Sequence, residues 1–259
     1  MSEMTVVNKK LMLAGMFLSR FSEEGLSALG FSTWHEAYNS LALSIGGKPS
    51  SLKLYRQEFD PYFPNGRTGW INKKIRRSRK ELIEEYSALG FAEFVQMVKA
   101  QFATEVDMDA SIGKAAVAAG IADEETAFAK RMITGYAAEN FFEAHYREVP
   151  DFSDCALTRT TSFGCGFDFK LSPPNRDFFA VEVKGLRTKS GQIQLTEKEF
   201  KMAEYLNNRF FLYVVTNFAQ TPMPCVISDP VNSGVTFEMK DVESRSRVWV
   251  AQIAAWPFM

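Results

Sequence analysis

The spacing of the apolar residues changes at about residue 156, and this change limits the folds that the chain can adopt. Before it, apolar residues recur at helical spacing in NKKLMLAGMFLSRF, TWHEAYNSLALSI, SLKLYRQEF, KELIEEYSALGFAEFVQMVKAQF and DEETAFAKRMITGYAAENFFEAHYREV. After it come short β-rich runs, namely ALTRTTS, GCGFDFKL, FFAVEVKG, FFLYVVTNF and SRVWVAQIAAW. We therefore predict an α/β protein with a helical first half and a sheet in the second.

The order of elements after residue 130 is predicted to be helix, three strands, helix, strand. SPPNRD is typical of a hairpin turn between the second and third strands. The second helix begins with a capping box, in which Thr196 is followed three residues later by Glu199. FFLYVVTNF is almost wholly apolar, as expected of a strand covered on both faces. This order predicts a mixed sheet.

Composition excludes several classes of protein. The 259 residues carry a net charge of −1, so the chain as a whole is not a basic nucleic-acid binder. No apolar run reaches the roughly 18 residues of a membrane span, and the N-terminal apolar patch continues as an amphipathic helix. Cys155, Cys165 and Cys225 lack CxxC spacing and fit free thiols in a reducing cytoplasm. Only two histidines, His35 and His145, are present, which favours neither a zinc site nor a serine–histidine triad.

FFAVEVKG places two charged residues inside an apolar strand. Side chains alternate between the faces of a strand, so Glu182 and Lys184 share one face and Val181 and Val183 share the other. The valines can pack into a core. Because unpaired buried charge is costly, the charged pair must meet water, a partner or a ligand.

GCGFDFKL repeats this pattern one strand earlier. Asp168 and Lys170 are expected on one face, with Phe167 and Phe169 on the other. If this strand pairs with FFAVEVKG, Asp168 converges with the charged pair of the next strand. Two carboxylates and a lysine on adjacent strands predict a Mg²⁺ site, in which Mn²⁺ can substitute, because both ions take oxygen ligands. The alternative is an exposed ion pair on a one-sided sheet beside a solvated aspartate.

The spacing of these residues resembles a nuclease motif. Asp168, thirteen residues and then Glu182-Val183-Lys184 resemble the PD-(D/E)XK pattern, with Phe167 in the place of its proline. GYAAENFFEAHY, GCGFDFK, FFAVEVKG, IQLTEKEFKMA and RFFLYVVTNF also look like the NO VEIN C-terminal-like domain, over roughly residues 132 to 218. That domain is widespread in restriction and phage-defence loci. The resemblance implies that Asp168 and Glu182 ligate Mg²⁺ and that Lys184 positions the attacking water.

The resemblance implies two further site residues outside these strands. Glu139, on the preceding helix, matches the helix-borne acid that completes the metal site, although an ordinary surface role is the alternative for a helical glutamate. Gln194, before the second helix, matches a polar position near the scissile phosphate. Gln192 is expected on the same strand face, so the choice between the two glutamines stays open.

The segment NKKIRRSRKEL is locally basic within a nearly neutral chain. It carries six cations before its first acid, namely Lys73, Lys74, Arg76, Arg77, Arg79 and Lys80. The turn-rich loop before it adds Arg67 and Trp70. Lysine and arginine contacts to phosphates supply sequence-independent affinity, and an aromatic side chain can stack on a base. We predict DNA contact here; the alternative is a solvated helix face with Trp70 in the core.

These observations predict a helical DNA-recognition domain over residues 1–125 and a PD-(D/E)XK-like nuclease domain over residues 126–259. The expected function is that of a cytoplasmic, Mg²⁺-dependent endonuclease of restriction or phage-defence type, acting on double-stranded DNA. Cutting with two-fold symmetry would require a homodimer. The alternatives are a catalytically inactive DNA-binding module and an interaction subunit of a defence complex.

Overall fold

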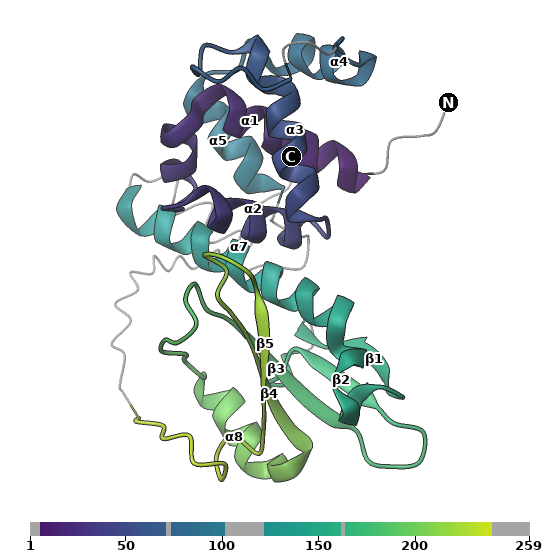
Figure 1. Ribbon diagram of the computed structural model, residues 1–259. Helices are drawn as coiled ribbons and strands as arrows, with labels where there is room; N and C mark the ends of the chain where they lie inside the picture. Colours follow the sequence, from purple (N-terminus) through teal and green to yellow (C-terminus); the bar gives the residue numbers. More distant parts are fainter. Residues whose placement is uncertain (1–5, 71–73, 102–121, 162–163, 240–259) are drawn as a thin grey trace, which may run out of the picture.

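The computed structural model describes residues 6–70, 74–101, 122–161 and 164–239, with the backbone alone over 122–129. Figure 1 shows a helical part at the top and a sheet below it, joined by α7 (Ala122–His145). The predicted α/β class is therefore confirmed. No helix in the described ranges is both long enough and apolar enough to cross a membrane.

Five α-helices and a short 3-10 turn build the described N-terminal part. They are α1 (Val6–Ala28), α2 (Trp34–Ser44), α3 (Pro49–Phe59), η1 (Asp60–Tyr62), α4 (Arg77–Tyr86) and α5 (Phe91–Ala100). The last two come from a single helical segment in the sequence pattern. It divides because α4 ends at Tyr86, and because the Glu93 carboxylate accepts a hydrogen bond from the backbone N–H of Gly90, the residue before α5.

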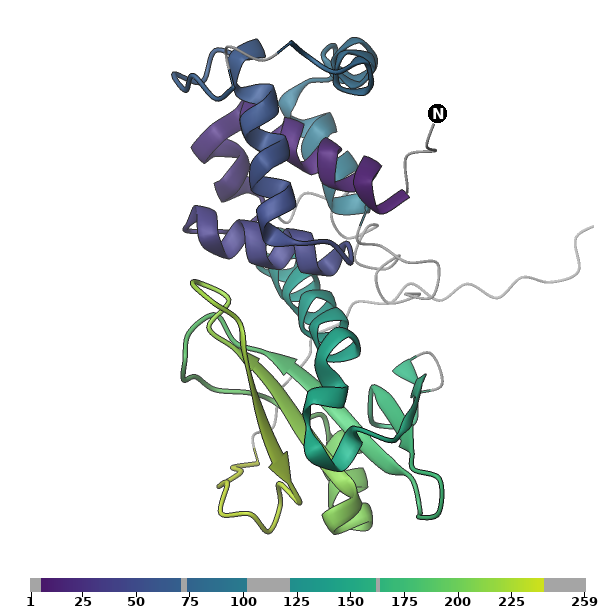
Figure 2. The same cartoon turned by 45° about the vertical axis from the view of Figure 1, so that its right-hand side comes forward.

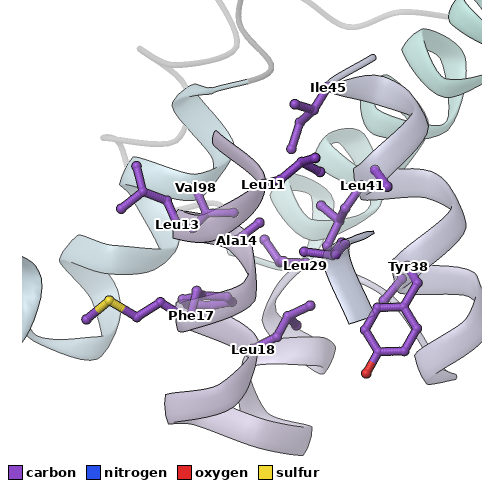
Figure 3. Close-up of a cluster of buried hydrophobic side chains, with 14 of the residues drawn as sticks. Leu11, Leu13, Ala14, Phe17, Leu18, Leu29, Tyr38, Leu41, Ile45 and Val98 are labelled. Carbon is purple, nitrogen blue, oxygen red and sulfur yellow. The ribbon is translucent and has the colours of Figure 1, made fainter. Parts of the chain in front are cut away.

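The core of this part is a cluster of apolar side chains from several helices (Figure 3). Leu11 and Leu18 of α1 belong to it together with Leu41 of α2. A glycine lets two helices approach closely, because a Cβ on Gly15 would lie 2.9 Å from the Cβ of Tyr55 in α3. This contact accounts for a glycine inside a helix, where it costs about 1 kcal/mol relative to alanine.

Helix α7 contributes to two cores. Ile133 belongs to the cluster of the N-terminal helices, whereas Ala137 and Phe142 belong to the cluster beneath the sheet. Figures 1 and 2 show the helix running from the helical part across the sheet. Two short 3-10 turns follow it, η2 (Tyr146–Glu148) and η3 (Pro150–Phe152). The predicted division at residue 125 falls inside α7 and remains a prediction.

The sheet has five strands in chain order. They are β1 (Ala156–Arg159), β2 (Phe169–Ser172), β3 (Phe179–Gly185), β4 (Phe210–Thr216) and β5 (Met223–Ser228). All neighbouring pairs are antiparallel except β3 and β4, which are parallel and connected through α8 (Glu197–Leu206) and η5 (Asn207–Arg209). The predicted order of helix, three strands, helix and strand is confirmed.

The strands of the structure differ from the predicted ones at β5. Sequence analysis missed β5, which contains a proline and is largely exposed, so its apolar pattern is weak. The run SRVWVAQIAAW, predicted as a strand, lies outside the described residues.

The two faces of the sheet have different covers. Val181 and Val183 pack in the cluster that contains Phe142 of α7. Ala180 packs on the opposite side with Ala203 of α8. The alternation predicted for β3 is therefore correct, and the face that carries Glu182 and Lys184 is the α8 face.

Polar contacts connect the N-terminal helices to the sheet part. The side-chain amide of Asn39 donates to the carbonyl oxygen of Phe218 at 2.8 Å. Nearby, the buried Glu36 carboxylate pairs with Lys130 Nζ at 2.8 Å and with Arg187 Nε at 2.9 Å. Glu36 is on α2 and Arg187 follows β3, so this cluster joins segments far apart in the sequence.

Candidate active site

A pocket of about 190 Å³ opens beside the α8 face of the sheet. Its wall comes from the loop before β2, from β3 and from the first turn of α8. The lining residues are Thr161, Gly164, Cys165, Gly166, Phe167, Asp168, Glu182, Thr196, Lys198 and Glu199. The pocket thus contains Asp168 and Glu182, two of the three carboxylates predicted as metal ligands, together with Glu199 from α8.

Asp168 lies one residue before β2 rather than inside it. Its backbone N–H still donates to the Val181 carbonyl at 3.0 Å, and its own carbonyl accepts from Thr160 N at 2.7 Å. Its Oδ2 accepts a hydrogen bond from Val183 N at 2.9 Å. Because Phe169 pairs with Val181, Asp168 stands opposite Glu182. The strand pairing therefore brings the two carboxylates together.

The prediction for Phe167 was wrong. Phe169 belongs to the cluster on the α7 side, whereas Phe167 packs against the cluster on the α8 side. Strict alternation fails because the chain bends before β2, with Gly166 at φ +84°. A Cβ on Gly166 would lie 3.0 Å from the Lys198 carbonyl oxygen, so glycine also lets this loop lie against α8.

Glu182 and Lys184 are in contact on the α8 face. Lys184 Nζ donates to Glu182 Oε1 at 2.5 Å and to Glu199 Oε2 at 3.0 Å. Glu182 is 3% exposed, and its lysine partner is also mostly buried. The predicted pair is therefore not an ordinary exposed ion pair.

Glu199 is a site residue that sequence analysis recognised only as part of a helix cap. The capping box is confirmed, since Glu199 N donates to Thr196 Oγ1 and Thr196 N donates to Glu199 Oε2 at 2.9 Å. The same oxygen accepts from Lys184. The chain order contained a signal for this contact, because a helix that follows β3 begins near the carboxyl end of that strand.

Burial and like charge dominate the electrostatics of the site. Burial first and then the Asp168 charge raise the pKa of Glu182 to about 9, against the opposing charge of Lys184. Burial also raises the pKa of Asp168, against hydrogen bonding from Val183 N and the charge of Lys184. Burial alone would lower the pKa of Lys184, but Glu182 and Glu199 raise it. Lys184 is in contact with Glu182 and Glu199, and Arg159 adds only a weaker effect on Asp168. The three acids are therefore short of positive charge.

This shortage of positive charge suits a hard cation. Mg²⁺ is commonly bound through one or two carboxylates and completes its shell with water, so Asp168 and Glu182 suffice as protein ligands. Across the described ranges, no three His, Cys, Asp or Glu side chains form a ready-made metal cage. The donor set thus fits an ion that keeps most of its waters, with Mn²⁺ as a chemically similar substitute.

Glu139 does not line the pocket. Its carboxylate pairs with Nη1 of Arg159, whose Nε also binds Glu143 Oε1 at 3.1 Å. The Arg159 guanidinium lies over the ring of Phe169, on the α7 side of the sheet. The structure therefore holds Glu139 in contact with Arg159, whose charge also opposes the rise in the pKa of Asp168.

The two glutamines also lie outside the pocket. Gln192 and Gln194 were expected on one strand face, but residues 191–196 form no strand and lead irregularly to the Thr196 cap. Both side chains are exposed. A shared strand face is therefore no basis for choosing between them.

Part of the predicted basic segment is neutralised by neighbouring acids. Arg77 pairs with Glu81 at 2.7 Å, and Lys80 with Glu84 at 3.6 Å, each one turn along α4. Such exposed pairs contribute little to stability, but they offset two of the positive charges of this segment. Lys73 lies outside the described residues.

Two arginines that were predicted to bind DNA hold the helices together. Arg79 is 8% exposed, pairs with Glu58 at 2.6 Å and lies over the ring of Tyr55. Arg67 pairs with buried Asp60 at 3.1 Å. Their guanidinium groups are used inside the fold, Arg79 by an acid of another helix and Arg67 by an acid of its own loop segment.

Three other predicted contacts surround a small pocket between α3 and α4. Trp70, Lys74 and Arg76 line it together with Tyr62 and Glu58, and its volume is about 40 Å³. Trp70 is half-buried, and its backbone N–H donates to Gln57 O at 3.2 Å. DNA contact at these residues remains a prediction.

The geometry defines a mixed α/β domain with an acidic, lysine-containing pocket at the junction of β2, β3 and α8. Residues 138–227 match the family described as "Protein NO VEIN, C-terminal". The matched range begins within α7 and includes the sheet as far as β5, so all residues of the acidic pocket lie in it. No curated protein and no solved structure matches the chain.

Proposed function

We propose that the chain is a Mg²⁺-dependent DNA endonuclease of the PD-(D/E)XK superfamily, of restriction or phage-defence type. The observation that carries the proposal is the pocket in which the partly buried Asp168 carboxylate stands opposite the buried Glu182 carboxylate. In the same pocket, Lys184 joins Glu182 to a third acid, Glu199. Perturbed pKa values of this kind concentrate at functional sites. The match to the NO VEIN C-terminal family and the Asp168–Glu182–Lys184 spacing support a nuclease over other metal-dependent activities.

Asp168 and Glu182 would hold the ion, and the remaining residues would control its surroundings. When bound, Mg²⁺ polarises a phosphodiester and lowers the pKa of a coordinated water. Lys184 would donate a hydrogen bond to an oxygen of the reacting phosphate or of the attacking water, and so stabilise developing negative charge. Glu199 would hold that ammonium at the pocket through its contact with Nζ.

The substrate in this proposal is double-stranded DNA. The helical N-terminal part would contribute to its recognition, with Lys74 and Arg76 as candidate contacts. A homodimer would let two such sites cut both strands symmetrically.

Nicking of a supercoiled plasmid tests the proposal directly. Wild-type protein is expected to nick with Mg²⁺ or Mn²⁺ and to be inactive in EDTA. Glu182→Gln should abolish nicking while keeping a folded circular-dichroism spectrum. The matched control is Glu197→Gln, the same substitution at an exposed glutamate on the first turn of α8, paired only with Lys201. It should nick like wild type.

One result of this assay would contradict the proposal. Absence of metal-dependent nicking by folded wild-type protein on plasmids of differing sequence and methylation would contradict the nuclease proposal. Retained DNA binding in that case would favour the catalytically inactive module.

A further inference from the structure

The rim of the acidic pocket carries a lysine that has no carboxylate partner among the described residues. Lys198 lies on the first turn of α8, lines the pocket and is exposed. Within the described ranges, no carboxylate lies at ion-pair distance from its ammonium group. Its neighbour Lys201, one turn on, is instead paired with Glu197 at 2.5 Å. Lys198 therefore keeps its full charge beside an acidic pocket.

A second such lysine lies on β2. Lys170 pairs in register with Ala180 and follows Asp168 by two residues, so it shares the α8 face with Asp168 and Glu182. Its Nζ lies 5.2 Å from the centre of the Phe178 ring, and the described residues offer it no ion pair. The face is open here, since Thr158, opposite Lys170 on β1, is exposed.

Aromatic rings connect these cations to the pocket. The ring of Phe167, a pocket residue, lies 6.2 Å from the ring of Phe178. The guanidinium of Arg209 lies 5.9 Å from the same Phe178 ring. Its only carboxylate contact in the described part of the chain is Asp177, whose side chain is 80% exposed. Lys170, Lys198 and Arg209 are called the cationic rim below.

We propose that the cationic rim binds backbone phosphates of duplex DNA on either side of the acidic pocket. This inference rests on the proposed function. An acidic pocket repels a polyanion until a metal ion is present, so the flanking phosphates need cations that the fold has left unpaired. Lys170 and Lys198 meet that requirement, because neither has an ion pair within the described residues, and Arg209 is held only by the exposed Asp177. On α4, by contrast, Arg77, Lys80 and Arg79 are all paired with acids.

The phosphate contacts would position the strand without reading its sequence. The arrangement of two lysines around the carboxylates, one on β2 and one on α8, then defines the path of the strand over the sheet. The basic segment that attracts attention in the sequence would contribute less than these separated residues.

Salt dependence of binding in EDTA tests the rim without requiring cleavage. Binding of a fluorescent duplex of mixed sequence is followed by anisotropy over a series of salt concentrations. Each phosphate contact contributes about 0.9 to the log–log slope, so Lys170→Gln with Lys198→Gln should reduce the slope by about 1.8. Each single variant should give about half of that change. Lys201→Gln, the control on the same helix, should leave the slope unchanged.

An unchanged slope in the double variant, with unfolding temperature equal to wild type, would overturn the inference. The plasmid assay is read separately. If wild type nicks the plasmid and the double variant leaves the slope unchanged, the rim does not bind phosphates and the nuclease proposal stands. If the double variant reduces the slope but wild type does not nick, the rim binds DNA and the nuclease proposal is wrong.

Discussion

Two buried glutamates of this protein have nearly the same exposure and opposite electrostatic surroundings. Glu36, between the helical part and the sheet part, is 1% exposed, and Glu182, in the acidic pocket, is 3% exposed. Glu36 pairs with two cations, Lys130 and Arg187. Glu182 shares Lys184 with Glu199 and faces Asp168 across the strand pair.

The pKa values follow from this difference. Burial would raise the pKa of Glu36, but hydrogen bonds from Lys130 and Arg187 outweigh it and hold the pKa below its ordinary value. At Glu182 burial and the Asp168 charge together outweigh Lys184. Burial alone therefore does not mark a functional acid. A buried acid whose charge is matched joins parts of the fold, whereas one short of positive charge is suited to a cation.

The largest expected contrast is in catalysis. Lys184→Arg keeps the charge, but the wide guanidinium cannot replace a compact ammonium at a reacting oxygen. We expect single-turnover cleavage with Mg²⁺ to slow by about 100–1,000-fold. The counterpart Arg187→Lys, at the Glu36 cluster, should leave the cleavage rate unchanged. If both substitutions slow cleavage equally, the acidic pocket and the Glu36 cluster do not differ in catalytic role.

A smaller contrast is expected in stability without metal. Glu36→Gln leaves Lys130 and Arg187 without their carboxylate and should destabilise the protein by about 2 kcal/mol, below the 3–5 kcal/mol of fully buried pairs because Arg187 is partly exposed. This corresponds to a fall of about 4–8 °C in the unfolding temperature. Glu182→Gln should leave that temperature equal or raise it, because it relieves repulsion with Asp168. Calorimetry in EDTA measures both, and a large loss in Glu182→Gln would show a structural role instead.

Stabilisation by Mg²⁺ should also differ between Glu36→Gln and Glu182→Gln. The expected difference in the free energy of unfolding is somewhat smaller than the one above. At ten times its dissociation constant, a ligand that binds only the folded state stabilises it by about 1.4 kcal/mol. Wild type and Glu36→Gln should both gain this from Mg²⁺, whereas Glu182→Gln should gain nothing. Unfolding with Mg²⁺ and with EDTA tests this without any DNA. A full gain in Glu182→Gln would exclude its carboxylate as a ligand.

The pH dependence gives the most gradual contrast, because it is spread over several pH units. The lowered pKa of Glu36 means that its stabilisation is present above its ordinary pKa of 4.5 and is lost as the pH falls through the folded value. The raised pKa of Glu182 gives the opposite dependence of stability on pH. Its contribution is fully present below 4.5 and is lost as the pH rises toward about 9.

Urea unfolding of wild type and both glutamine variants across this range gives the test. The advantage of wild type over Glu36→Gln should shrink at the acid end. The advantage of Glu182→Gln over wild type should grow toward the alkaline end. Parallel pH curves for all three proteins would contradict both pKa assignments.

Features that depend on near neighbours in the chain were predictable. The alternation in β3, the antiparallel β2–β3 pairing and the Thr196 capping box all follow from side-chain period and local hydrogen bonding. Because β2 and β3 pair through a short turn, the convergence of Asp168 with Glu182 followed from the same rules. Alternation failed only at Phe167, where a bend precedes the strand.

The choice of ion-pair partner was decided only by the tertiary structure. The sequence pattern gives Arg79 no acid partner, yet it pairs with Glu58 of another helix. Arg187 pairs with Glu36, far earlier in the chain. Glu199 is a helix cap by sequence and a lysine ligand by packing. The sequence by itself determined most of the elements and which face of β3 carries charge, because these depend on spacing along one segment. Packing decided which charges are satisfied, because Coulomb energy depends on distances between segments that no local pattern contains.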